Sequence, residues 1–199
     1  MRNRDADKEQ LVKQKAIELL VSDGFEGFSI NKLAKACGIS VATIYIYYKD
    51  KDDLIVQVAI EEATRLTDEI LKDFDPELPF AEGIRQQWRS RSRQLLDNPK
   101  SAVFFEQLRS STYQHKVHDA IVSQFKEAMG RFMQNAIARG EIDPLPLEVF
   151  WSVAYAPMYN LIRFHNEGRS IAGRPFTLTD EVLQQTCELV IKALKKTDT

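Results

Sequence analysis

The chain has 199 residues, of which 44% are hydrophobic and 28% charged, and its formal net charge is −2. This composition is ordinary for a folded protein, so it excludes a disordered chain and a uniformly basic nucleic-acid binder. No apolar run approaches the roughly 20 residues of a membrane span, and the first ten residues contain no apolar signal core, so we expect a cytoplasmic protein without a membrane partner.

The first predicted helix covers about residues 6–23, where apolar residues recur at helical spacing. Residues 28–54 then indicate two short helices and the start of another. Ser29 and Ser40 stand at the N-cap positions of the two short helices, and Gly38 suits the turn between them. This is the pattern of a helix-turn-helix, which places its second helix in the major groove of DNA.

The charge pattern of this segment is also uneven. From Gly27 to Lys49 there is no Asp or Glu, whereas Lys32, Lys35 and Lys49 all lie there. A solvated lysine face would be an equal explanation if the segment stood alone. Beside a helix-turn-helix, the lysines favour a basic surface for DNA.

The rest of the chain also indicates helices, and no strand alternation or internal repeat is present. The predicted class is therefore all-α, with about nine helices. Pro157 lies inside one of them and should kink it, either opening a cavity or bending the helix around the core. The further predicted helices cover about residues 50–74, 82–98, 101–111, 117–140, 147–166 and 180–195.

Residues 28–54 resemble the DNA-binding domain of the tetracycline-repressor (TetR) family of transcriptional regulators. The resemblance rests on the run from Ile30 to Gly38, the run from Thr43 to Tyr48, and on Lys51 and Leu54. It implies a DNA-binding domain at residues 1–54 and a helical ligand-binding and dimerisation domain at residues 55–199.

The resemblance also assigns roles within the helix-turn-helix. Ile39, Ile44 and Tyr48 are expected to pack inward. The first turn of the second helix is expected to face base edges, and the aromatic pair after it to face phosphates. Residues on either side are expected to make further contacts with the DNA backbone. The implied DNA-binding residues are Ser29, Lys32, Ser40, Val41, Ala42, Thr43, Tyr45, Tyr47, Lys49 and Lys51.

The helix over residues 147–166 is apolar nearly all round, so it needs cover on more than one side. Together with the last helix it resembles the family's dimer interface, in which each subunit contributes two helices. We therefore expect a homodimer through the last two helices, whose two-fold symmetry matches a palindromic operator in double-stranded DNA.

Aromatic and apolar residues with some polar groups typify ligand cavities, although a plain core contains the same residues. A small hydrophobic or amphipathic effector is the implied ligand. Arg85, Arg89 and Arg93 recur every four residues, with Arg91 nearby, and form either a solvated face or a site for an anionic effector or an acidic helix flank. The candidate ligand-binding residues are Trp88, Phe104, Phe105, Gln107, Phe125, Met129, Trp151, Tyr155, Met158 and Tyr159.

The leading hypothesis is a homodimeric repressor that a small ligand releases from a palindromic operator. The alternatives are an activator of the same family and a helical ligand-binding or protein-partner module without regulatory activity. No nucleophile–base arrangement, phosphate loop or metal spacing is present, so we expect neither an enzyme nor a cofactor or metal. Cys37 and Cys187 are expected to be buried apolar side chains.

Overall fold

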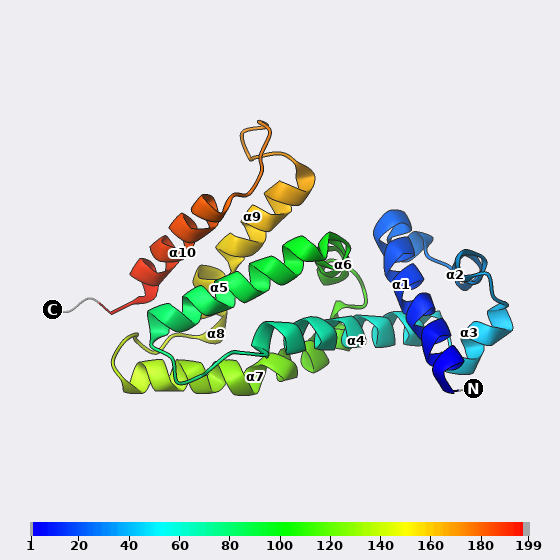
Figure 1. Ribbon diagram of the computed structural model, residues 1–199, viewed down its shortest axis with the longest axis horizontal. Coiled ribbons are helices and arrows are strands. Elements are labelled where there is room, and N and C mark those ends of the chain that lie inside the picture. The colour runs from blue at the N-terminus through cyan, green and yellow to red at the C-terminus, as the bar shows by residue number, and fades with distance from the viewer. Residues whose placement is uncertain (1, 197–199) are drawn as a thin grey trace. The chain divides into compact units, whose positions relative to one another are not determined.

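The computed structural model describes residues 2–196, except for the side chains of residues 2–6 and of Gln124. All regular elements in this part of the chain are α-helices (Figure 1), which confirms the all-α class. They are α1 (Arg2–Gly27), α2 (Ile30–Cys37), α3 (Val41–Tyr47), α4 (Lys51–Leu71), α5 (Phe80–Asp97), α6 (Pro99–Arg109), α7 (Gln114–Ala138), α8 (Leu147–Ala154), α9 (Ala156–Glu167) and α10 (Asp180–Leu194).

Two breaks raise the number of separate helices above the predicted nine or so. Gly24 adopts φ 72° and ψ 168° inside α1, a conformation that suits glycine and kinks the helix. The predicted helix over 147–166 is divided at Tyr155, and Pro157 lies in the first turn of α9, where its missing N–H is tolerated. At the break, the carbonyl of Ala154 accepts a hydrogen bond of 2.8 Å from the indole Nε1 of Trp88.

The chain divides into two compact units. The first comprises residues 1–66 and 98–124, and so contains α1 to α3, most of α4, α6 and the start of α7. In its core, Phe25 stacks on Phe104 of α6, with ring centroids 5.9 Å apart. The predicted DNA-binding domain, residues 1–54, lies within this unit, and its functional boundary at residue 54 remains a prediction.

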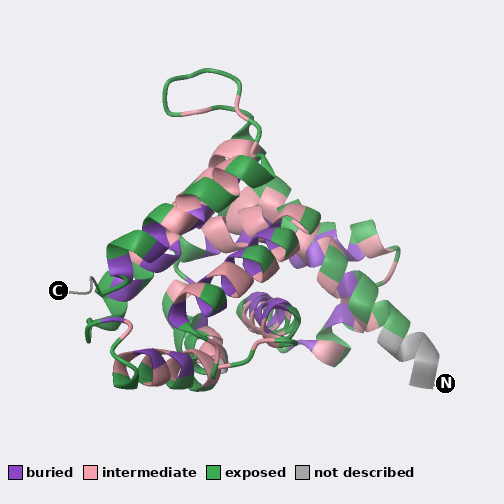
Figure 2. Ribbon diagram, turned by 60° about the vertical axis from the view of Figure 1, so that its left-hand side comes forward, coloured by how far each residue is buried: buried purple, intermediate pink, exposed green. Residues whose placement is uncertain are grey.

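The second unit comprises residues 67–97 and 125–199. Here α5 packs beside α9 and α10 (Figure 1). Buried residues recur along one side of α10 (Figure 2), namely Cys187, Val190, Ile191 and Leu194. No helix in residues 2–196 is both long enough and apolar enough to cross a membrane.

Candidate functional site

The short helix α3 is held by a cap at its start and by buried side chains at its end. The hydroxyl of Ser40 accepts a hydrogen bond of 3.1 Å from the backbone N–H of Thr43, and the two hydroxyls lie 2.8 Å apart. Ile44 and Tyr48 are buried, as the sequence predicted. A helix turns about 100° per residue, so these two anchors determine which residues of α3 point outward.

The outward face of α3 consists of Ala42, Tyr45 and Ile46. Tyr45 is 51% exposed and Ile46 is 76% exposed, and Ala42 is also exposed. Sequence reasoning missed Ile46, although its position two residues after the buried Ile44 already places it on the opposite side of the helix. This face presents a methyl group, an aromatic hydroxyl and an apolar side chain.

Other predicted DNA contacts of α3 are less accessible. Val41 and Tyr47 are half-buried and pack against the core, as does Ile39. Val41 and Tyr47 therefore expose less of their side chains to DNA than Ala42 and Tyr45 do. All these contacts remain predictions.

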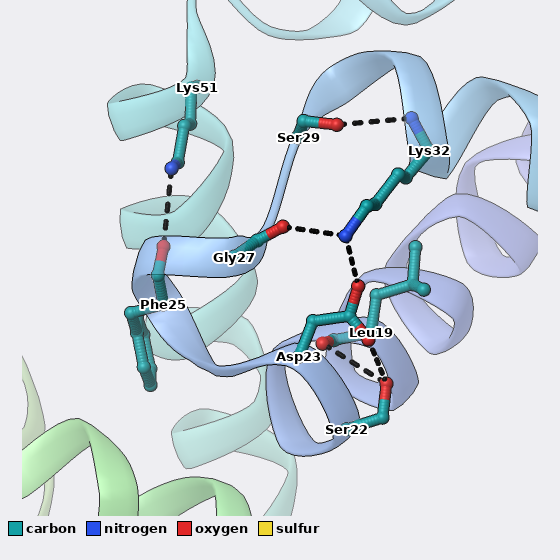
Figure 3. Close-up of polar contacts among 8 residues, drawn as sticks. All are labelled: Leu19, Ser22, Asp23, Phe25, Gly27, Ser29, Lys32 and Lys51. Atoms are coloured by element: carbon teal, nitrogen blue, oxygen red, sulfur yellow. Dashed lines mark hydrogen bonds and ion pairs between the residues drawn. The ribbon is translucent and has the colours of Figure 1, made fainter.

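The ammonium of Lys32 is already bound within the protein (Figure 3). It donates to the Asp23 carboxylate at 2.6 Å and to the carbonyl of Gly27 at 3.1 Å. The hydrogen bond from Lys32 lowers the pKa of Asp23. Ser29 caps α2, accepting from the backbone N–H of Lys32 at 3.3 Å. A phosphate contact by Lys32 would therefore compete with an internal carboxylate.

Lys51 connects the first turn of α4 to the last turn of α1 and to Phe28, which follows α1. Its ammonium donates to the carbonyl of Phe25 at 3.2 Å (Figure 3) and lies 5.9 Å from the ring centroid of Phe28. An ammonium has three N–H groups, so this bond leaves donors for a phosphate. Lys49 is exposed just before α4.

The carboxylates at the start of α4 also have partners within the first unit. Asp52 accepts hydrogen bonds of 2.7 Å from Lys116 and from the hydroxyl of Tyr113, and these bonds lower the pKa of Asp52. Asp53 accepts from the side chain of Gln57 and from the backbone N–H of Lys49, both at 2.8 Å. The ion pair with Lys116 offsets the negative charge of Asp52, whereas the neutral donors to Asp53 leave its charge in place.

The ten candidate ligand-binding residues are divided between the two units. Phe104, Phe105 and Gln107 lie on α6 in the first unit, where Phe104 is fully buried. Gln107 donates to the carbonyl of Val21 at 3.2 Å. These three residues pack against α1, and their contact with a ligand remains a prediction.

Four of the other candidates surround one arginine in the second unit. Arg91 of α5 is only 1% exposed. Its Cζ lies 4.5 Å from the ring centroids of Phe125 and Tyr155 and 5.5 Å from that of Trp151. Its Nη1 donates to the hydroxyl of Tyr159 at 3.2 Å. The remaining candidates Trp88 and Met158 are buried, and Met129 is half-buried.

The four arginines of α5 thus have different environments. Arg85 forms an ion pair of 2.6 Å with Glu188 of α10, and Arg89 and Arg93 are exposed. Only Arg91 is buried, and sequence reasoning did not single it out. The burial of Arg91 could have been predicted from the sequence, because Arg91 continues the helical spacing of the residues that are buried on α5, namely Ile84, Gln87, Trp88 and Leu95.

Comparison with known proteins agrees with this arrangement. Residues 12–58 match the model of the "Bacterial regulatory proteins, tetR family", a stretch that includes all of α2 and α3. The fold is similar to the crystal structure of a TetR family transcription regulator from Marinobacter aquaeolei, with a TM-score of 0.86 and 26% identity. The match covers 99% of this chain and 100% of that one. The helix-turn-helix segment of the chain belongs to the TetR family.

Two further proteins are similar to this chain, one in sequence and one in fold. An uncharacterized HTH-type transcriptional regulator from Haemophilus influenzae is 33% identical over 99 residues, which are 50% of this chain and 53% of that relative. The chain thus spans about half of that relative's length. FadR from Bacillus subtilis, solved in complex with stearoyl-CoA, shares the fold at a TM-score of 0.75 and 16% identity, over 94% of this chain and 99% of its own.

Proposed function

We propose that the protein is a homodimeric repressor that binds a palindromic operator through α3 and is released by a small amphipathic ligand. The outward face of α3 carries this proposal. Ala42, Tyr45 and Ile46 are exposed together on a helix whose other side is fixed in the core. A rigid, exposed helix face is what major-groove recognition needs.

Exposed apolar residues of the second unit support the homodimer. Leu147 and Val149 on α8 and Leu189 on α10 are all exposed, and Leu189 is 61% exposed. A two-fold axis would bring the same patch of each subunit together. It would also place two α3 helices in successive major grooves, about 34–36 Å apart.

The aromatic residues around Arg91 support a ligand site in the second unit, because such sites combine apolar walls with a few polar groups. The stearoyl-CoA bound to the FadR of Bacillus subtilis is consistent with an apolar ligand body. In the proposed mechanism, the ligand binds one conformation of the dimer more tightly and thereby lowers its affinity for DNA. This output requires binding and no catalysed reaction.

The test is fluorescence anisotropy with the DNA upstream of the protein's own gene. We expect this fragment to bind at least about 1,000-fold more tightly than unrelated DNA, with affinity falling as salt rises. Ala42→Glu adds a negative charge to the exposed face of α3 and should abolish binding. Ala138→Glu adds the same charge at the end of α7 and should not. Equal affinity for unrelated DNA, or unchanged binding by Ala42→Glu, would contradict the proposal.

A further inference from the structure

The guanidinium of Arg91 is a buried charge without an acidic partner among the described residues. An arginine stays protonated at any physiological pH. Buried charges in proteins are normally paired with an opposite charge, because removing an ion from water is costly. The environment of Arg91 therefore suits an anion that the protein itself does not supply.

The contacts that Arg91 does make orient it without neutralising it. Its Nε donates to the side-chain oxygen of Gln87 at 3.0 Å, and its Nη1 donates to the hydroxyl of Tyr159 at 3.2 Å. Both acceptors are uncharged. The rings of Phe125, Tyr155 and Trp151 stabilise the cation through their π faces. They leave its positive charge in place.

Three buried polar atoms around this cation have no hydrogen-bond partner among the described residues. They are Nη2 of Arg91, Nε2 of Gln87 and the hydroxyl oxygen of Tyr155. Burial raises the pKa of Tyr155 to about 12, although the guanidinium of Arg91 opposes this shift. Tyr155 is therefore a neutral hydroxyl at pH 7, and it can donate a hydrogen bond but cannot serve as the counter-ion.

We propose that the effector is an amphipathic oxyanion whose carboxylate or phosphate head group pairs with Arg91. The amide of Gln87 and the hydroxyl of Tyr155 supply further donors to the head group. The apolar body lies against Phe125 and Trp151, rings of the same cluster that retain some solvent exposure. This inference rests on the proposed function, since it specifies the chemistry of the ligand that releases the DNA.

An oxyanion accounts for all the observations together. Its oxygens are acceptors only, matching a cluster in which Arg91 and Gln87 have unused N–H groups. Two oxygens on one head group also match the planar fork of a guanidinium. A neutral or cationic head group would leave the charge of Arg91 uncompensated.

The first test compares head groups on one apolar chain. Decanoate, decyl phosphate and the neutral decanamide are each titrated into the full-length protein by isothermal titration calorimetry, with thermal unfolding as a second measurement. We expect decanoate or decyl phosphate to bind at least about tenfold more tightly than decanamide, and the tighter of the two identifies the head group. Equal binding of all three, or no binding by either anion, would overturn the proposal.

The second test separates recognition by Arg91 from a structural role. Arg91→Met should weaken binding of the preferred anion on the order of 100-fold, because one partner of a buried charge pair is removed. It should leave the unfolding temperature of the free protein unchanged or higher, since an uncompensated buried charge is lost. Arg93→Met removes an exposed charge from the same helix and should bind the anion as the wild type does. Wild-type affinity in Arg91→Met, or a large fall in its unfolding temperature, would refute the assignment.

Release of operator DNA distinguishes this inference from the proposed function. If the preferred anion binds through Arg91 but leaves DNA bound, the head-group assignment is supported and ligand release is wrong. If decanamide releases DNA as well as the anions do, ligand release is supported and the oxyanion assignment is wrong. Release by the anion alone, lost in Arg91→Met, supports both.

Discussion

Two tyrosines three residues apart have opposite environments. Tyr45 lies on the exposed face of α3, whereas the hydroxyl of Tyr48 is buried without a hydrogen-bond partner among the described residues. Removing each hydroxyl therefore tests a different property of the same segment.

We expect Tyr45→Phe to weaken operator binding about fivefold to tenfold, corresponding to one lost hydrogen bond of about 1 kcal/mol. The unfolding temperature should not change, because Tyr45 is exposed. The matched variant Tyr48→Phe should bind DNA as the wild type does, with equal or greater stability. Anisotropy and thermal unfolding measure both effects, and an unaltered affinity in Tyr45→Phe would remove this residue from the DNA-binding surface.

The hydrogen bond between Lys32 and Asp23 leads to a variant that we expect to bind DNA more tightly than the wild type. Asp23→Asn should increase DNA affinity twofold to fivefold, because it removes a negative charge and releases the ammonium of Lys32 toward a phosphate. The slope of log K against log salt should steepen by about 0.9, the value for one additional phosphate contact.

The control is Glu26→Gln, which removes an exposed negative charge close by in the same helix but does not touch the contact of Lys32. If both variants raise the affinity equally and the salt dependence stays the same, net charge alone is responsible. Lys32 would then have no phosphate contact of its own.

At the scale of helices, Gly83 allows α5 to approach α7 closely. A Cβ atom at this position would overlap the ring of Phe132, which is fully buried. That ring cannot move freely, since its centroid lies 5.4 Å from that of Phe74 and 6.0 Å from that of Phe80.

Gly83→Ala should therefore lower the free energy of unfolding by about 1–3 kcal/mol or more, through overpacking. Gly130 of α7 is the matched control, because a Cβ there would meet no atom within 4 Å. Gly130→Ala should raise the free energy of unfolding by about 0.5–1 kcal/mol through helix propensity. Urea unfolding followed by circular dichroism measures both, and a neutral Gly83→Ala would show that the contact relaxes.

Short-range signals made the helices and their ends predictable. The caps at Ser29 and Ser40, the turn at Gly38 and the inward positions of Ile44 and Tyr48 all follow from neighbouring residues. The break at Tyr155 was only partly predictable, because Pro157 signals a kink but does not determine whether it becomes a complete interruption.

Tertiary contacts explain what the sequence did not reveal. The bond between Lys51 and Phe25 joins residues 26 positions apart, so no local pattern predicts it. The burial of Arg91 depends on rings from α7, from α8 and from Tyr155 at the break after α8, which only the folded unit brings together. Phe104 was a pocket candidate by composition; the structure shows that it stacks on Phe25, a contact that composition does not predict, and its contact with a ligand remains a prediction.

For the whole molecule, the proposed dimer makes oligomeric state and DNA binding depend on each other. Leu189→Glu places a charge at the exposed apolar residue of α10 and should convert the proposed dimer to a monomer at micromolar concentration. Operator affinity should fall at least tenfold, because one subunit contacts only half of a palindrome. Light scattering coupled to size-exclusion chromatography measures the mass.

Val122→Glu introduces the same charge at another exposed apolar position, on α7, and should remain dimeric. A Leu189→Glu variant that also remains dimeric would place the interface elsewhere. A monomeric variant with full operator affinity would instead refute two-fold recognition of the operator.

The exposed Ile46 has a consequence for the temperature dependence of operator recognition. Ile46 is 76% exposed in the free protein, and its side chain is removed from water if it enters the major groove. Burial of apolar surface gives association a negative heat-capacity change. Plots of the logarithm of affinity against inverse temperature should therefore be curved, and Ile46→Ala should make them straighter.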